Sequence, residues 1–250
     1  MPVWLQAGMW GLVAGGALVL GALLAWFVRV PRSVVATVMA FGAGVLISAL
    51  AFDLVAEAES TGGLTPTLIG FLGGAATYVA ANVALAARGA RHRKRSQDQQ
   101  PSEQEQSGSG TAIAIGALLD GVPESTVLGL TLLTGQGIGI SVLVAVFISN
   151  LPEGLSSAAG MKRAGRGSAY VFGVWGGIAV TSGVAGALGV LLLTGAAPAL
   201  IAVITAVAAG AILAMVADTM IPEAFEQTHL YAGLVATVGF ALAFAVGRLG

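Results

Sequence analysis

Two stretches of this chain place proline and carboxylate side chains inside long apolar runs: "LLDGVPES" (residues 118–125) and "ISNLPEGL" (residues 148–155). A third stretch, "MIPEAFE" (residues 220–226), repeats the Pro-Glu pair at the end of another apolar run. An acidic side chain at the centre of a membrane helix costs about 2.5 to 3.5 kcal/mol on insertion scales. Acids in such positions therefore indicate a functional site.

The composition makes lipid the expected solvent of the chain. Of its 250 residues, 56% are hydrophobic and 9% are charged, and the mean hydropathy is +0.90. Soluble domains carry about 25% charged residues, so this chain could not cover a soluble core. The absence of cysteine excludes disulfides and thiolate metal sites. A net charge of −1 gives no reason to expect nucleic acid as a partner.

The apolar runs predict an all-α polytopic membrane protein with eight transmembrane helices, because a span needs roughly 20 apolar residues. The predicted spans cover residues 8–28, 33–56, 63–87, 111–134, 137–160, 168–194, 198–221 and 230–247. We read residues 1–250 as a single membrane domain. Residues 88–110 are basic, then Gln/Glu-rich, then Gly/Ser-rich, which predicts a disordered cytoplasmic loop.

Lysine and arginine predict the orientation. Ten of the eleven basic residues fall in the connections after the first, third and fifth spans, namely Arg29, Arg32, Arg88, Arg91, Arg93, Lys94, Arg95, Lys162, Arg163 and Arg166. Only Arg248 falls on the other side. The positive-inside rule makes the crowded side cytoplasmic, so both termini are expected outside a plasma (inner) membrane.

The central acids share helix faces. Asp120 and Glu124 are four residues apart in the fourth span, and Ser149 and Glu153 are four apart in the fifth, beside Asn150. Since no predicted span contains lysine or arginine, we expect no internal salt bridge. The acids must then be hydrated, protonated or neutralised by a bound cation. We therefore predict a midplane cation site from these five residues.

Further acids extend this site towards both faces. In the predicted orientation, Asp53 and Glu57 lie near the outer face, as an entrance, and Asp218 and Glu223 lie near the inner face, as an exit. The result is a ladder of carboxylates across the bilayer, as a cation path requires. Carboxylate, amide and carbonyl oxygens suit Mg²⁺, Mn²⁺ and Ca²⁺, whereas imidazole suits zinc and iron better.

An internal repeat connects the two halves of the chain. A shift of 166 residues lays "GVLISALAFDLVAEA" (residues 44–58) over "GAILAMVADTMIPEA" (residues 210–224). Residues 1–87 and 168–250 are then three-helix repeats around the central helix pair 111–160. An odd number of connections inverts the second copy, which is a transporter architecture.

These features resemble the ZIP (Zrt/Irt-like) family of divalent metal transporters. That family has eight spans in a 3+2+3 inverted repeat, with His-Asn-x-Pro-Glu-Gly motifs in spans 4 and 5. Here span 4 reads Asp-Gly-Val-Pro-Glu-Ser and span 5 reads Ser-Asn-Leu-Pro-Glu-Gly. The resemblance assigns metal-binding positions to Glu124, Asn150 and Glu153, and places Asp120 and Ser149 where the family has histidines. Both histidines of this chain, His92 and His229, fall outside the predicted spans.

The resemblance implies transport of a divalent metal toward the cytoplasm, with Zn²⁺ first and Mn²⁺ or Fe²⁺ as alternatives. The ion is the transported substrate, and no catalytic cofactor or enzymatic activity is expected. The other expected partner is the lipid bilayer, and a homodimer is compatible with the sequence. Two rivals remain open: a proton-coupled carrier of another solute that uses the acids as a proton relay, and a non-transporting relative with an altered span 4. An intramembrane aspartyl protease is disfavoured, because no Gly-x-Gly-Asp occurs.

Overall fold

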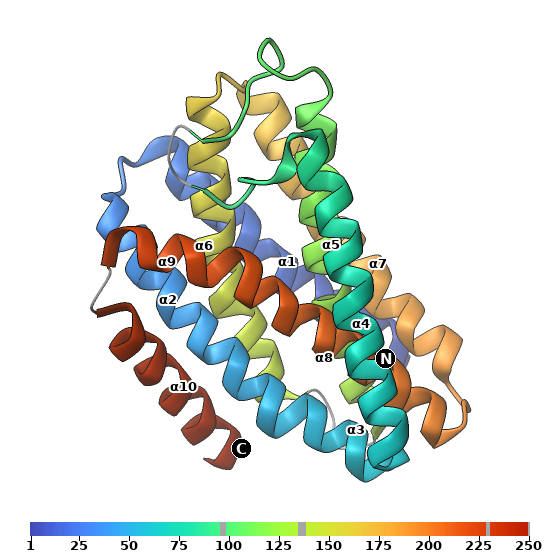
Figure 1. Ribbon diagram of the computed structural model, residues 1–250. Helices are drawn as coiled ribbons and strands as arrows, with labels where there is room; N and C mark the ends of the chain where they lie inside the picture. The colour runs from blue at the N-terminus through green and yellow to red at the C-terminus, as the bar shows by residue number, and fades with distance from the viewer. Residues whose placement is uncertain (96–98, 135–138, 229–230, 250) are drawn as a thin grey trace.

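The computed structural model describes residues 1–95, 99–134, 139–228 and 231–249, and all regular structure within these ranges is helical (Figure 1). Seven continuous helical stretches in them are long and apolar enough to cross a membrane. They are α1 (Val3–Phe27), α2–η1–α3 (Arg32–Ala49, Leu50–Leu54, Val55–Gly62), α4–η2 (Leu64–Leu85, Ala86–Ala90), α5 (Ser109–Thr131), α6 (Ile140–Arg163), α7 (Ser168–Leu193) and α8–η4–α9 (Pro198–Met215, Val216–Met220, Ile221–Thr228). An eighth, shorter apolar helix is α10 (Ala232–Leu249), and a 3₁₀ turn, η3 (Leu132–Thr134), follows α5. The prediction of an all-α fold is confirmed for the described residues, and the apolar helices are compatible with a multi-pass membrane protein.

The helices pack in pairs around α5 and α6. Helix α1 packs on α7, α4 on α8, and α2 on α10 (Figure 1). Helix α6 lies against α1 and α2, while α5 lies chiefly against α7, so α5 and α6 touch each other at few places. The two helices that carry the central acids are therefore held by their neighbours more than by one another.

Close helix crossings explain the glycine in "ISNLPEGL". A Cβ atom at Gly154 of α6 would collide with the Leu18 backbone of α1, and one at Gly21 of α1 would collide with Leu151. Small residues let membrane helices approach to this distance. The glycine of the motif is therefore a packing residue, and the carboxylate beside it is held at a fixed place relative to α1.

Of the three π-helical turns in the described residues, η1, η2 and η4, two lie 166 residues apart. The first, η1 (Leu50–Leu54), contains Asp53, and the second, η4 (Val216–Met220), contains Asp218. Such turns are rare in proteins, and those that do occur frequently lie at functional sites. Pro222 cannot donate to the carbonyl of Asp218, which favours the irregular turn in the second case. The spacing equals the shift that aligns the two halves of the sequence.

The described parts of residues 88–110 pack against the bundle, in contrast to the disordered loop that the composition predicts. At the end of η2, Gly89 adopts φ 100°, a conformation that favours glycine, and the chain turns back there towards the helices. Nε2 of the buried Gln100 lies 2.9 Å from the Arg93 carbonyl and 3.1 Å from the Ser157 carbonyl of α6. Composition alone missed this packing because a few specific polar contacts, and no apolar run, fix the segment.

Candidate functional site

Helices α5 and α6 bring three acids into the protein interior. Asp120 and Glu124 of α5 and Glu153 of α6 are 4%, 1% and 3% exposed. The phenol of Tyr78, on α4, donates a hydrogen bond of 2.7 Å to Asp120 Oδ1. Buried carboxylates need such partners, since an unpaired charge is costly in a low-dielectric interior.

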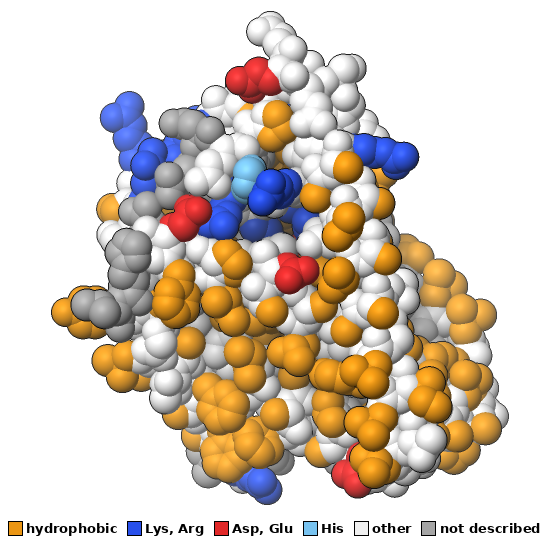
Figure 2. Space-filling view, viewed as in Figure 1, with side chains coloured by type: hydrophobic (Ala, Val, Ile, Leu, Met, Phe, Trp, Pro, Cys, Tyr) orange, Lys and Arg blue, Asp and Glu red, His pale blue; other side chains and the backbone are white. Residues whose placement is uncertain are grey.

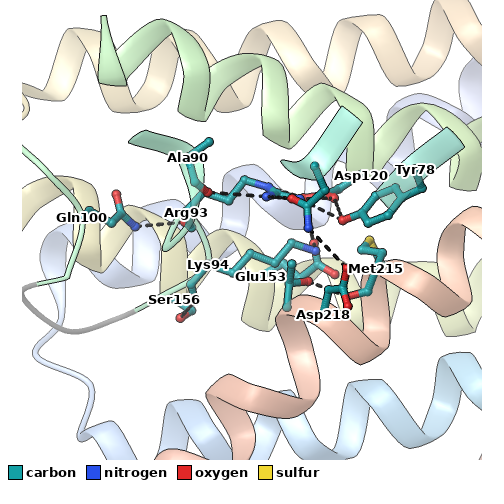
Figure 3. Close-up of polar contacts among 12 residues, drawn as sticks. Tyr78, Ala90, Arg93, Lys94, Gln100, Asp120, Glu153, Ser156, Met215 and Asp218 are labelled. Atoms are coloured by element: carbon teal, nitrogen blue, oxygen red, sulfur yellow. Dashed lines mark hydrogen bonds and ion pairs between the residues drawn. The ribbon is translucent and has the colours of Figure 1, made fainter. Parts of the chain in front are cut away.

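The strongest partner of Asp120 is Arg93, which reaches in from the segment after η2 (Figure 3). Its guanidinium makes a two-pronged contact, with Nε 3.0 Å from Oδ2 and Nη2 2.9 Å from Oδ1. Nη2 also donates to the Tyr78 hydroxyl at 2.8 Å, and Nη1 donates to Asn82 Oδ1 at 2.7 Å. Arg93 is 2% exposed and holds a complete set of acceptors, so it is fixed firmly beside α5.

The neighbouring Lys94 bridges the two helices. Its ammonium nitrogen lies 2.6 Å from Glu153 Oε2 and 3.4 Å from Asp120 Oδ2, and the residue is 5% exposed. The expectation that no internal salt bridge forms is therefore wrong. It considered only basic residues within the spans, whereas these two cations come from a connecting segment that folds back between the helices.

Part of the acid cluster remains unsatisfied. Glu124 Oε1 and Glu153 Oε1 are buried and have no hydrogen-bond partner, and the Lys94 ammonium, although within ion-pair distance, is not aligned for a hydrogen bond. Glu124 lies one helical turn after Asp120 on α5. The cluster therefore has carboxylate oxygens to offer to a further cation or proton.

The other two predicted midplane residues take different places. Asn150 lines a small cavity with Asp120, Glu153 and Lys94, and its Nδ2 donates to the Ala14 carbonyl at 2.9 Å. The amide oxygen of Asn150 therefore remains for a ligand. Ser149 does not line this cavity; its hydroxyl donates to the Val146 carbonyl at 3.0 Å.

The predicted entrance residues, Asp53 and Glu57, line a cavity of about 530 Å³. Between this cavity and Glu124 lies a layer of aliphatic side chains from α2, η1, α5, α6 and α8, namely Leu46, Leu50, Leu54, Val127, Val142, Val146 and Ile212. The free space in that layer is only about 10 Å³, roughly one water molecule. The acid cluster is therefore closed off from the cavity that Asp53 and Glu57 line.

The predicted exit residues lie on the other side of the cluster. Asp218 lines a cavity of about 330 Å³ that Lys94 also borders, and it accepts a 3.4 Å hydrogen bond from Asn82 Nδ2. Glu223 is buried; its Oε1 lies 3.0 Å from the Ser156 hydroxyl, and its Oε2 lies 3.5 Å from Nη1 of Arg95. Figure 2 shows basic side chains and a histidine gathered towards this end of the visible face.

Sequence reasoning missed Arg93, Lys94 and Arg95 as parts of the site. The sequence offers only the run of three consecutive basic residues. In the structure they face acids from three different helices, since Arg93 pairs with Asp120, Lys94 with Glu153 and Arg95 with Glu223. His92 lies beside them, with Nδ1 3.2 Å from the Gln99 carbonyl, and His229 lies outside the described residues.

The acid cluster can bind cations, since it already binds the cationic side chains of Arg93 and Lys94. Within the described ranges, no group of three or more His, Cys, Asp or Glu side chains is placed to hold a metal ion. The acids are arranged around Lys94 and Arg93 in this conformation. A scan against protein-family models gives no match, and a search of curated proteins gives none either.

Proposed function

We propose that this chain is a multi-pass transporter that moves divalent metal cations toward the cytoplasm through the cluster of Asp120, Glu124 and Glu153. In this proposal it resides in the plasma membrane with both termini outside, and the end that carries residues 91–95 faces the cytoplasm. The observation that carries the proposal is the buried carboxylate cluster between an outer and an inner cavity.

The chemistry of the cluster supports a cationic substrate. Its present occupants are an ammonium and a guanidinium, and two carboxylate oxygens remain unpaired. Asn150 adds an amide oxygen at the same small cavity. A desolvated divalent ion needs several such oxygens to replace its lost water.

The closure on both sides supports alternating access. Aliphatic side chains close the cluster towards the outer cavity, and Lys94 lies between the cluster and the inner cavity. A carrier must pass through such an occluded state, in which its site is open to neither side.

The paired features of the two halves support an inverted repeat. Besides the two π-helical turns, the glycines at positions 44 and 210 both stand where a Cβ atom would strike the backbone of a neighbouring helix, α10 and α4 respectively. The packing of α2 on α10 corresponds to that of α8 on α4 under the same exchange of halves. We propose that α1–α4 and α7–α10 form the two repeats and that α5 and α6 carry the ion between them.

Two arguments about which ion is transported give different answers. The resemblance favours Zn²⁺, with Mn²⁺ or Fe²⁺ as alternatives. The oxygen donors of the cluster favour the harder Mn²⁺ among these three. Uptake into proteoliposomes, measured for each ion alone and in competition, ranks them.

The test of transport is the double variant Asp120→Ala with Glu153→Ala in the same proteoliposomes. We expect metal uptake to fall to the level of empty vesicles, because both charged walls of the site are lost. The matched control replaces the exposed Glu59 of α3 by Ala and keeps full uptake. Full uptake by the double variant would refute the proposed site.

A proton-coupled carrier of another solute is the second candidate. The buried Glu124, whose Oε1 has no hydrogen-bond partner, favours it as a proton-binding position. A ligand that binds only the folded protein raises its unfolding temperature. A thermal shift with Mn²⁺ or Zn²⁺ in detergent therefore supports metal transport. No shift with any divalent ion, together with solute-dependent proton flux, would favour the rival.

A further inference from the structure

Lys94 occupies the position that a transported cation would take. Its ammonium lies between a carboxylate of α5 and a carboxylate of α6, at 3.4 Å from Asp120 and 2.6 Å from Glu153. Figure 3 shows Lys94 beside Glu153. Lys94 also borders the inner cavity, so it lies between the cluster and that cavity.

Lys94 and Arg93 are held very differently. Arg93 has hydrogen-bond acceptors for all of its nitrogens, from Asp120, Tyr78 and Asn82. The Lys94 ammonium is buried with no aligned hydrogen bond, although it has three protons to donate. Arg93 is therefore a fixed anchor, whereas the Lys94 ammonium, within the described residues, contacts only the two carboxylates and is the easier of the two to displace.

The backbone around Lys94 is tied to α6, which keeps the side chain at the site. The hydroxyl of Ser156 contacts the Lys94 carbonyl, and Gln100 bridges the Arg93 and Ser157 carbonyls. Such tethering gives the ammonium a high effective concentration at the carboxylates, so it competes with free ions without itself diffusing away.

We propose that Lys94 is a tethered counter-ion that a divalent substrate must displace, and that it thereby excludes monovalent ions. This inference rests on the proposed metal transport. With all groups ionised, three acids and two bases leave the cluster with one net negative charge. A divalent ion in place of Lys94 makes it neutral, whereas a monovalent ion only exchanges one positive charge for another and loses the tether.

The first test uses the wild-type protein, because Lys94 and Lys162 are its only lysines. Purified protein in detergent is treated with an amine-acetylating reagent, and acetylation of each lysine is measured by mass spectrometry. Lys162 is exposed and serves as the internal control. Without metal, we expect Lys94 to react at least about tenfold more slowly than Lys162, because it is buried and ion-paired. Saturating Mn²⁺ or Zn²⁺ should raise the Lys94 rate severalfold and leave Lys162 unchanged.

The second test compares Lys94→Met with Lys162→Met. Equilibrium binding of Mn²⁺ and Zn²⁺, measured by metal analysis after dialysis, should tighten about tenfold or more in Lys94→Met, equivalent to about 1.4 kcal/mol. High Na⁺ should inhibit metal binding to Lys94→Met and have little effect on the wild type. Lys162→Met should behave as wild type in both respects.

The outcomes separate this inference from the function on which it rests. Metal binding that is equal in the wild type and Lys94→Met, with Lys94 acetylation unaffected by metal, would overturn the inference and leave metal transport standing. No metal binding by the wild type or by either variant would overturn the proposed function and the inference with it. Binding that appears only in Lys94→Met would show that these ions do not displace Lys94, and would overturn the inference.

Discussion

The proposed outer end of the carboxylate ladder and its centre differ in what neutralises their acids. At the outer end, Asp53 and Glu57 are half-buried and face a cavity of about 530 Å³. At the centre, Asp120 and Glu153 are buried and are paired with cations of the chain itself. Water can hydrate the outer acids, whereas the buried ones require a charged partner. The comparison shows that depth in the bundle, and not residue type, decides how each acid is accommodated.

The largest expected effect comes from removal of the buried ion pair between Asp120 and Arg93. Asp120→Asn leaves a guanidinium that is 2% exposed without its counter-charge. Loss of one member of a buried pair typically costs 3–5 kcal/mol, so we expect the free energy of unfolding to fall by about that amount. Denaturant unfolding in detergent micelles measures it.

The control for this prediction removes both charges. The double variant Asp120→Asn with Arg93→Met should recover most of the lost stability, because no unpaired charge remains. If Asp120→Asn unfolds like the wild type, Arg93 is not buried against it in the folded protein.

Glu124 sharpens the comparison, since it is a central acid whose Oε1 has no partner. Glu124→Gln keeps the shape and leaves no cation unpaired, so we expect stability to change by less than about 1 kcal/mol. Metal uptake should fall by about tenfold or more, because a ligand oxygen loses its charge. The matched variant Glu59→Gln, at an exposed acid, should transport normally. Unchanged uptake in Glu124→Gln would remove Glu124 from the site.

The wet and dry regions can be distinguished by thiol labelling, because the chain has no cysteine of its own. We expect Thr61→Cys, in the outer cavity, to react with a membrane-impermeant maleimide in intact cells. Arg91→Cys should react only after the membrane is opened, and Leu128→Cys, fully buried, should react in neither case. Labelling of Arg91→Cys in intact cells would reverse the proposed orientation.

The smallest expected effect concerns the connecting segment between η2 and α5, which carries Arg93 and Lys94. Its Glu103 accepts hydrogen bonds from Arg166 and from the backbone N–H groups of Gly108 and Gly110, and these lower the pKa of Glu103 from 4.5 to about 2. A lowered pKa in the folded state stabilises the packed segment at pH values above about 4.5 and loses this effect as pH falls towards 2.

We therefore expect Glu103→Gln to increase hydrogen exchange of the described segment 99–108 slightly at pH 7. The difference from the wild type should shrink as the pH falls from about 4.5 towards 2, because the wild-type carboxylate is then protonated as well. The measurement compares hydrogen exchange of the two proteins at each pH, with exchange times adjusted for the change of the intrinsic exchange rate with pH. A difference that grows on acidification would contradict the assigned contact.

Much of the architecture could be predicted from the sequence. The long apolar runs gave the positions of seven helices, although some ends differ: the helix predicted at 33–56 continues to Gly62 and stops where Gly63 adopts φ 84°. The burial of Asp120, Glu124 and Glu153 was also predictable, since each lies within an apolar run. Hydropathy is a local property, so it transfers directly from sequence to structure.

The partners of the buried acids were not predictable in the same way. Arg93 and Lys94 belong to a stretch whose composition is that of a disordered loop, and nothing local indicates that Gly89 turns them back into the bundle. The sequence by itself determined that acids are buried in a helical membrane protein, because that follows from which residues adjoin them. Only the tertiary structure decided which cations meet them, because ion pairs depend on distances between segments far apart in the chain.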